Sequence, residues 1–203
     1  ISNFISYFVG EMLPTKDLVI IGQKIKFVNA FYIDEVFYTY SEFASSISRL
    51  RKSIQSVTSA TETNIGLVTN NDLESYAGII ALWFEGKAYV PLGPKTPQNR
   101  NEEIIQQAGL TTIIDSSVTP LFPTYQIITS KDFPKAKTNL VPKETDNQKL
   151  AYLIFTSGTT GTPKGIPITR ENVSSFIDAF WAIGFNIDEN DRFLQMADLT
   201  FDM

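Results

Sequence analysis

The chain has 203 residues, of which 43% are hydrophobic and 12% aromatic, enough to bury a sizeable core as one large domain or two small ones. Its 17 basic and 22 acidic side chains give a formal charge of -5, which argues against a broad electrostatic surface for nucleic acid. The chain contains no Cys and no His, which excludes disulfides, thiolate nucleophiles, imidazole bases and the usual zinc sites.

The N-terminal stretch ISNFISYFVGEM has apolar residues at Phe4, Ile5, Phe8 and Met12, which predicts an amphipathic helix. It lacks the basic start and long apolar core of a signal peptide. No run in the chain approaches the roughly 20 apolar residues that cross a bilayer. We therefore expect a soluble, cytoplasmic protein without a membrane partner. The first residue is not Met and the last residues, ADLTFDM, are apolar, so we expect the N-terminal portion of a longer protein.

Helical and strand patterns alternate along the first half of the chain. Residues 26–40 are rich in β-branched and aromatic side chains and predict a hairpin or two edge strands, with Asp34-Glu35 as the turn. Apolar residues at spacings of 4, 3, 4 and 3 then predict a helix over 41–57, capped by Ser41. The helical residues of this apolar face are Phe43, Ile47, Leu50, Ile54 and Val57.

The remaining elements continue the alternation. Thr96 is expected to cap a helix that begins at Pro97 and ends at Gly109. Polar residues with two prolines over 131–149 predict a surface connection. The other expected strands are 64–70, 87–92, 111–115, 125–129, 149–155 and 165–169, and the other expected helices are 72–84 and 169–183. Strands separated by helices of this length predict an α/β fold with a largely parallel sheet and helices on its faces.

The stretch LIFTSGTTGTPKGIPIT, residues 153–169, joins two of these strands through a loop. Ligands of open α/β sheets bind at the carboxyl ends of the strands, where this loop is expected. Gly158, Gly161 and Gly165 allow backbone conformations that are closed to other residues, so that N–H groups can approach an anion. The hydroxyls add donors, and Lys164 supplies a positive charge. The composition predicts a site for a polyphosphate, held by Thr156, Ser157, Gly158, Thr159, Thr160, Gly161 and Lys164.

Two other interpretations of this stretch are a nucleotide-binding P-loop and a turn without a ligand. The P-loop pattern is Gly-x4-Gly-Lys-[Ser/Thr], but here Pro163 takes the position of its second Gly and Gly165 that of its hydroxyl residue. The residues that follow predict a strand, whereas a P-loop opens a helix. A turn rich in Gly, Ser and Thr remains compatible with composition alone.

The stretch FTSGTTGTPKG resembles the phosphate-binding signature of the adenylate-forming superfamily, which comprises acyl-CoA synthetases, luciferases and non-ribosomal peptide synthetase adenylation domains. The match is unbroken from Thr156 to Gly165. FYTYSEFASSISRLRKSI and LWFEGKAYVPLGPKTPQNR are similar to two further elements of the superfamily, in the same order. The second departs from the family pattern at Phe84 and Glu85, which replace Lys-Ala, and at Gly93, which replaces Asp. These two elements are expected to build the sheet rather than a catalytic site.

The C-terminal LTFDM is similar to the element that begins the substrate pocket in amino-acid-activating members. The resemblance implies that Asp202 pairs with the α-ammonium of an amino acid. It also implies that residues 1–203 form the N-terminal portion of an adenylation domain. The remainder of that domain, the Mg²⁺ ligands and the C-terminal lid domain with its catalytic lysine would lie downstream, so these residues alone are expected to be inactive.

The resemblance implies a ligase reaction in two steps. A carboxylate, here an amino acid, reacts with MgATP to give an acyl-adenylate and pyrophosphate, and a thiol then takes the acyl group. The 156–165 loop would hold the β- and γ-phosphates, with Lys164 as the catalytic cation. The thiol would be the phosphopantetheine of a carrier protein, or CoA. A peptide synthetase module, a stand-alone D-alanine–carrier protein ligase, an acyl-CoA or aryl-acid ligase and a non-catalytic nucleotide-binding relative all remain open.

Overall fold

The computed structural model describes residues 27–157, 162–184 and 191–200. The helix expected over residues 4–12 lies outside these ranges. The first described element is the hairpin of β1 (Asn29–Ile33) and β2 (Val36–Thr39), which pair antiparallel. Its turn residues Asp34 and Glu35 both have positive φ, at 49° and 64°, which matches the twist of the two strands. The predicted hairpin and its turn are confirmed.

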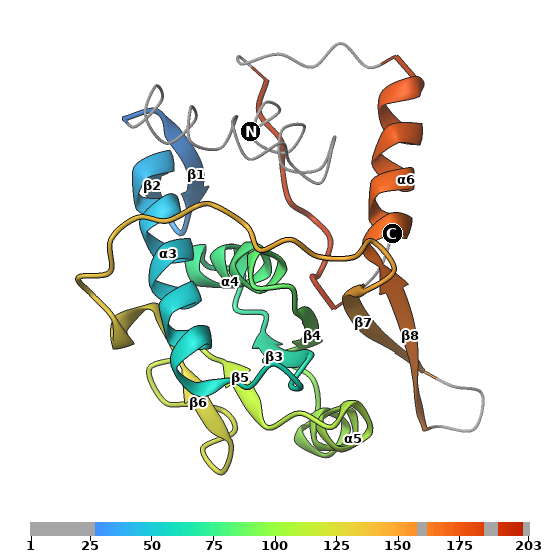
Figure 1. The fold of residues 1–203 in the computed structure, drawn as a ribbon. Helices are drawn as coiled ribbons and strands as arrows, with labels where there is room; N and C mark the ends of the chain where they lie inside the picture. The colour runs from blue at the N-terminus through green and yellow to red at the C-terminus, as the bar shows by residue number, and fades with distance from the viewer. Residues whose placement is uncertain (1–26, 158–161, 185–190, 201–203) are drawn as a thin grey trace.

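A six-stranded sheet forms the centre of the molecule, in the order β6-β5-β3-β4-β7-β8 (Figure 1). All neighbouring pairs are parallel except β7 and β8, which are antiparallel at one edge. The strands are β3 (Asn64–Val68), β4 (Ala88–Leu92), β5 (Thr112–Ile114), β6 (Gln126–Ile128), β7 (Leu150–Ser157) and β8 (Pro163–Thr169). The predicted α/β fold with a largely parallel sheet is confirmed.

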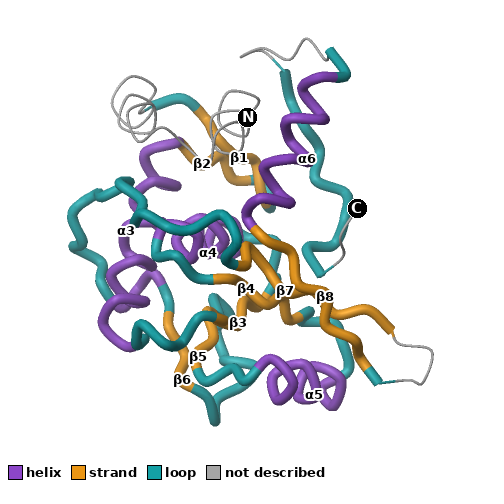
Figure 2. Tube along the Cα trace, turned by 45° about the vertical axis from the view of Figure 1, so that its right-hand side comes forward, coloured by secondary structure: helices purple, strands orange, loops and turns teal. Residues whose placement is uncertain are grey.

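The helices cover both faces of the sheet. α3 (Tyr40–Val57) and α4 (Leu73–Phe84) lie on one face and α5 (Gln98–Ala108) on the other, as Figures 1 and 2 both show. The chain leaves β3 for β4 through α4, and then leaves β4 for β5 on the other side of β3 through α5. Right-handed crossovers in these opposite directions place their helices on opposite faces. α6 (Arg170–Ala182) follows β8. No helix in the described ranges is long and apolar enough to cross a bilayer.

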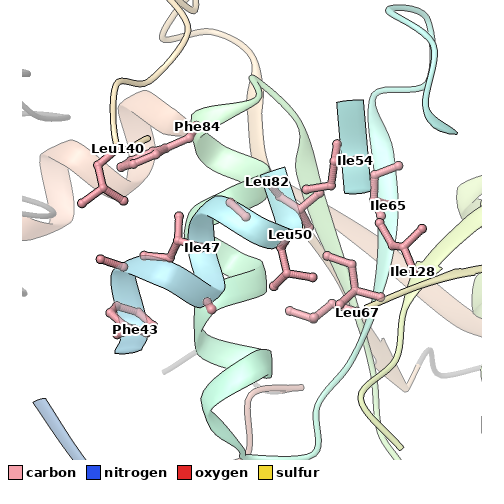
Figure 3. Close-up of a cluster of buried hydrophobic side chains, with 14 of the residues drawn as sticks. Phe43, Ile47, Leu50, Ile54, Ile65, Leu67, Leu82, Phe84, Ile128 and Leu140 are labelled. Atoms are coloured by element: carbon pink, nitrogen blue, oxygen red, sulfur yellow. The ribbon is translucent and has the colours of Figure 1, made fainter. Parts of the chain in front are cut away.

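The apolar face predicted for α3 forms the main core. Phe43, Ile47, Leu50 and Ile54 are buried against α4 and the sheet (Figure 3). Burial of such side chains contributes about 1.5–3 kcal/mol each. Val57, the last residue of the predicted face, is exposed at the end of the helix. A second core lies on the α5 face of the sheet and includes Val90, Leu92, Ile105 and Ile113.

The structure corrects two predicted helix caps. Thr39 rather than Ser41 caps α3: its hydroxyl accepts the N–H of Glu42 at 3.2 Å, and the Glu42 carboxylate accepts the Thr39 N–H at 2.7 Å. The Thr-x-x-Glu spacing in the sequence is typical of this reciprocal capping arrangement. α5 is capped by the extended residue Pro97 without any side-chain hydrogen bond, because Thr96 lies one residue too early. Gly109 ends α5 in the left-handed conformation at φ 62°, as predicted.

The connection over residues 131–149 is more than a surface linker. Leu140 is buried in the main core, only 7% exposed. The Ser48 hydroxyl accepts the N–H of Asn139 at 2.9 Å, and Nη1 of Arg51 donates to the Asn139 carbonyl at 2.9 Å. Composition did not indicate this role, because one apolar side chain and a few hydrogen bonds of the backbone hold a segment that is otherwise polar.

A buried ion pair joins α3 to the end of α4. Nε of Arg51 donates to Oε1 of Glu85 at 2.7 Å, and their side chains are 5% and 1% exposed. Gln55 donates to the same oxygen, and the exposed Lys143 pairs with Oε2. Burial alone raises the pKa of Glu85, but the hydrogen bonds from Lys143, Arg51 and Gln55 outweigh burial, so its pKa lies below the ordinary value. Glu85, a departure from the family pattern, therefore has a structural partner.

Replacing Glu85 by Ala should lower the free energy of unfolding by about 3–5 kcal/mol, because Arg51 would remain buried without its carboxylate. The double variant Glu85→Ala/Arg51→Met should cost clearly less than the sum of the two single changes. Urea unfolding of the four proteins measures this coupling. Additive costs would show that the pair does not act as a unit.

The same pair predicts a pH dependence. The pKa of Glu85 is lower in the folded than in the unfolded protein, so its stabilisation is complete above the ordinary value of 4.5 and is lost as the pH falls through the folded pKa. The difference in stability between the unaltered protein and Glu85→Ala should therefore shrink below about pH 4.5. Unfolding curves from pH 7 to pH 3 test this, and a constant difference would contradict it.

Candidate functional site

The Gly- and Thr-rich stretch lies between the two antiparallel strands β7 and β8. The strands extend further into the stretch than predicted, because their ladder continues through the pairs Thr156–Lys164 and Ser157–Pro163. Thr156 and Ser157 therefore belong to β7, and Lys164 belongs to β8. The expectation of one loop over 156–165 is wrong at both ends.

The centre of the predicted phosphate site falls outside the described ranges. Gly158, Thr159, Thr160 and Gly161 are in this position, and so is Asp202, the predicted contact of an amino group. Their roles stay predictions, as do those of Thr156, Ser157 and Lys164, whose backbone positions are described.

Thr156 and Lys164 are directly opposite each other on the two strands. Residues opposite each other in an antiparallel pair project their side chains to the same side of the sheet. Both residues are exposed. The strand pairing thus presents a hydroxyl and an ammonium group on the same side of the sheet, on either side of the sequence segment that contains the predicted N–H donors.

Gly165 has a different role from the one predicted. It lies within β8 opposite Phe155, and the glycines with positive φ in the described ranges are Gly86, Gly109 and Gly184. A Cβ atom at Gly165 would meet the Phe155 ring at 3.1 Å and a Leu153 methyl group at 3.2 Å. The missing side chain therefore makes room for the facing aromatic ring, whereas an unusual backbone conformation was expected.

A cavity of about 790 Å³ opens at the carboxyl ends of β3, β4 and β7. Thr69 and Asn70 follow β3, Gly93 follows β4, and Thr156 lies near the end of β7; all four line the cavity. Lys164 is not among its lining residues. Because parallel strands end at the same edge of a sheet, this cavity occupies the place where α/β sheets bind their ligands.

The cavity also contains residues that the sequence did not single out as a site. Lys95 precedes α5, while Arg100 and the buried Asn101 lie in its first turns. In the sequence, their position directly after the strand 88–92 could have indicated that they belong to a site. The resemblance to the family led us to expect only a structural role for this segment, and the neighbouring strands in the structure show which edge of the sheet it faces.

Arg170 and Trp83 fasten the candidate site to the rest of the fold. Arg170 begins α6 directly after β8 and is 5% exposed, and its Nη2 donates to the Trp83 carbonyl at 2.7 Å. Burial lowers the pKa of Arg170 below its ordinary value. The indole Nε1 of Trp83 donates to the Ala151 carbonyl of β7 at 2.8 Å. The end of α4 thus holds both β7 and the segment that follows β8.

Comparison with known families settles the relationship that the signature suggested. Residues 23–203 match the family of AMP-binding enzymes. The chain belongs to this family. Bacitracin synthase 2 of Bacillus licheniformis is 29% identical over 165 residues, which are 81% of this chain and 6% of that protein. The non-ribosomal peptide synthetase sidC of Arthroderma benhamiae is 32% identical over 179 residues, 81% of this chain and 3% of that protein.

Solved structures of AMP-binding enzymes share the fold. The N-terminal subdomain of Klebsiella oxytoca NpsA, in complex with 3-hydroxyanthranilyl-AMSN, superimposes with a TM-score of 0.69 at 22% identity, over 93% of this chain and 48% of that subdomain. The peptide synthetase FmoA3 in its AMPPNP-bound form superimposes with a TM-score of 0.77 at 21% identity, over 92% of this chain and 20% of that protein's chain. The chain thus spans about half of one solved subdomain and a small part of the synthetases that it resembles.

Replacing Arg170 by Met should lower the free energy of unfolding by about 1.5–3 kcal/mol, because the change removes the hydrogen bond of a buried charged group to the Trp83 carbonyl. Chemical denaturation measures the loss. Arg49→Met, on the partly buried side of α3, is the control for loss of an arginine charge. An equal or larger loss of unfolding free energy for Arg49→Met would contradict a specific role for the Arg170–Trp83 contact.

Proposed function

We propose that the protein activates an amino acid as its acyl-adenylate and then transfers the acyl group to the phosphopantetheine thiol of a carrier protein. In the first step a carboxylate oxygen forms a bond to the α-phosphorus of ATP, and the bond to the bridging oxygen breaks to release pyrophosphate. In the second, the thiol sulfur attacks the acyl carbonyl, the acyl–phosphate bond breaks, and AMP leaves. The first step needs no general base, so it is compatible with a segment that contains no His.

The observation that carries this proposal is the position of the signature. Thr156, near the end of β7, and Lys164, near the start of β8, flank the centre of the signature at the carboxyl edge of the parallel sheet, and Thr156 lines a large cavity. Its central N–H groups and hydroxyls, with Lys164, would bind the β- and γ-phosphates, where negative charge accumulates as pyrophosphate leaves. Catalysis of this kind is positioning and electrostatic stabilisation.

ATP would be bound together with Mg²⁺, as expected for a reaction of its phosphates. The described residues contain no group of three or more acidic side chains that could hold a metal ion. We therefore assign no metal ligand to this part of the chain. Contacts to adenine, ribose and the metal would come from the portion of the family fold that this chain does not span, so residues 1–203 alone should not complete the reaction.

The names of the relatives favour a peptide synthetase over a stand-alone D-alanine ligase. Bacitracin synthase 2 and sidC are both large synthetases. FmoA3 has been solved with α-methyl-L-serine-AMP, and PA1221 contains adenylation and carrier domains. These are properties of those proteins, and they support an amino acid and a carrier protein as the partners proposed here.

An aryl acid is the second candidate for the substrate. NpsA has been solved with 3-hydroxyanthranilyl- and 3-hydroxybenzoyl-AMSN, both of which carry aryl groups. Asp202, the residue proposed to bind an α-ammonium group, distinguishes the two substrate classes. Exchange between ATP and pyrophosphate, measured on the full-length protein with amino, aryl and fatty acids, decides between them; stimulation by no acid would favour a non-catalytic nucleotide-binding relative.

Lys164→Ala should slow amino-acid-dependent exchange by roughly 10- to 1000-fold, because it removes one charged contact to the phosphates. Lys52→Ala, at an exposed position of α3, is the matched control for loss of a lysine. Initial rates at saturating substrate, with folding checked by circular dichroism, measure the effect. An unchanged rate for Lys164→Ala, or an equal loss for Arg170→Met under conditions where it is folded, would contradict the role assigned to Lys164.

A further inference from the structure

Most of the large apolar side chains that are exposed in the described ranges lie on one side of the molecule. They include Tyr32 and Phe37 of the hairpin, Phe176 of α6, and Phe193, Leu194 and Met196. Figures 1 and 2 both show the hairpin, α6 and residues 191–200 at the end of the molecule opposite α5. Extended apolar surfaces of this kind mark places that another part of a protein covers.

Two cavities follow residues 193–199 along this side. The first, of about 620 Å³, lies between this segment, β1 and α4, and its lining includes Phe31, Tyr76, Ile79, Ile80 and Trp83. The second, of about 380 Å³, lies between the same segment, the sheet and α6, and its lining includes Tyr89, Tyr152, Val173 and Phe176. Asp198 is the one charged residue in the two linings. Together the cavities form an apolar groove, and its scarcity of charge is typical of a permanent interface.

Residues 193–199 have the pattern of a strand without a neighbour. Leu194 and Met196 are 82% and 83% exposed, whereas Ala197 and Leu199 are half-buried and line the second cavity. Exposure that alternates with a period of two is typical of a strand. No backbone N–H of this segment donates a hydrogen bond to a residue in the described ranges. The segment therefore offers free backbone groups and two apolar side chains to a partner strand.

The length of the family fold indicates which partner this is. This chain spans 48% of the solved NpsA N-terminal subdomain, so about half of that subdomain has no counterpart in residues 1–203. The match to AMP-binding enzymes continues through the segment to residue 203. A partner on the same polypeptide suits an apolar groove that would be costly to expose in a finished protein.

We propose that the groove and residues 193–197 are the docking face for the half of the AMP-binding subdomain that residues 1–203 do not span. A strand of that half would pair with the backbone of residues 193–197. Leu194 and Met196 would be buried beneath it, and apolar side chains would fill the groove. The inference rests on the family of the chain and is independent of the proposed reaction.

Hydrogen exchange of the full-length protein, followed by mass spectrometry, tests the pairing. The N–H groups of residues 193–197 should exchange at least roughly 100-fold more slowly than in an unstructured chain, because paired groups exchange only when the structure opens. The N–H of Val118 is the internal control and should exchange freely. It donates no hydrogen bond in the described ranges, and its side chain is 100% exposed.

A pair of matched substitutions in the full-length protein tests the burial. Leu194→Asp should lower the folding equilibrium constant by at least roughly tenfold, because it would place a carboxylate in an apolar interface. Val118→Asp makes the same kind of change at a fully exposed position and should have little effect. Urea unfolding measures both.

Four results would overturn the inference. Free exchange at residues 193–197 would refute the pairing without any substitution, and equal effects of Leu194→Asp and Val118→Asp would refute the burial. Protection that disappears when a dimer is diluted to monomers would assign the face to a second copy of the chain. Protection that disappears when residues 1–26 are removed from the full-length protein would assign it to that segment instead.

Discussion

The arrangement of this molecule depends on β7, which pairs in parallel with β4 on one side and antiparallel with β8 on the other. The parallel pairing places the end of β7 at the same edge as the ends of β3 and β4. The antiparallel pairing brings β8 back along β7 from the pair Ser157–Pro163 onward. Thr156 and Lys164, which flank the centre of the signature, are therefore held near the carboxyl edge of the sheet by backbone hydrogen bonds.

The scaffold behind this edge is fastened by polar contacts at the end of α4. Trp83 donates to β7 and accepts from Arg170, while Glu85, two residues later, pairs with Arg51 of α3. The C-terminal end of a helix carries partial negative charge, which suits a buried guanidinium. These contacts connect the edge of the sheet with the α3–α4 layer. Trp83 holds β7 and the start of α6, and the pair of Glu85 and Arg51 holds the end of α4 against α3.

Two parts of the chain that line the cavity differ in their relation to the family pattern. The signature that resembles AMP-binding enzymes begins at Thr156 of β7 and ends at Gly165 of β8. The segment between β4 and α5 departs from the family pattern at Gly93, whereas Arg100 matches that pattern.

The sequence by itself determined the elements, the α/β class and the family, because apolar periodicity and the unbroken signature are properties of short segments. It placed the predicted apolar face of α3, apart from the exposed Val57, and the helix end at Gly109 correctly, since both depend on local patterns. It misplaced the caps at Ser41 and Thr96 and the role of Gly165. Only the tertiary structure brought Arg100 and Asn101 to the same cavity as Thr156, and Arg51 to Glu85. Arg51 and Glu85 are 34 residues apart in the sequence, and Thr156 is still further from Arg100 and Asn101. Local sequence patterns encode periodicity and turns, whereas such contacts arise only when crossovers and strand order bring distant segments together.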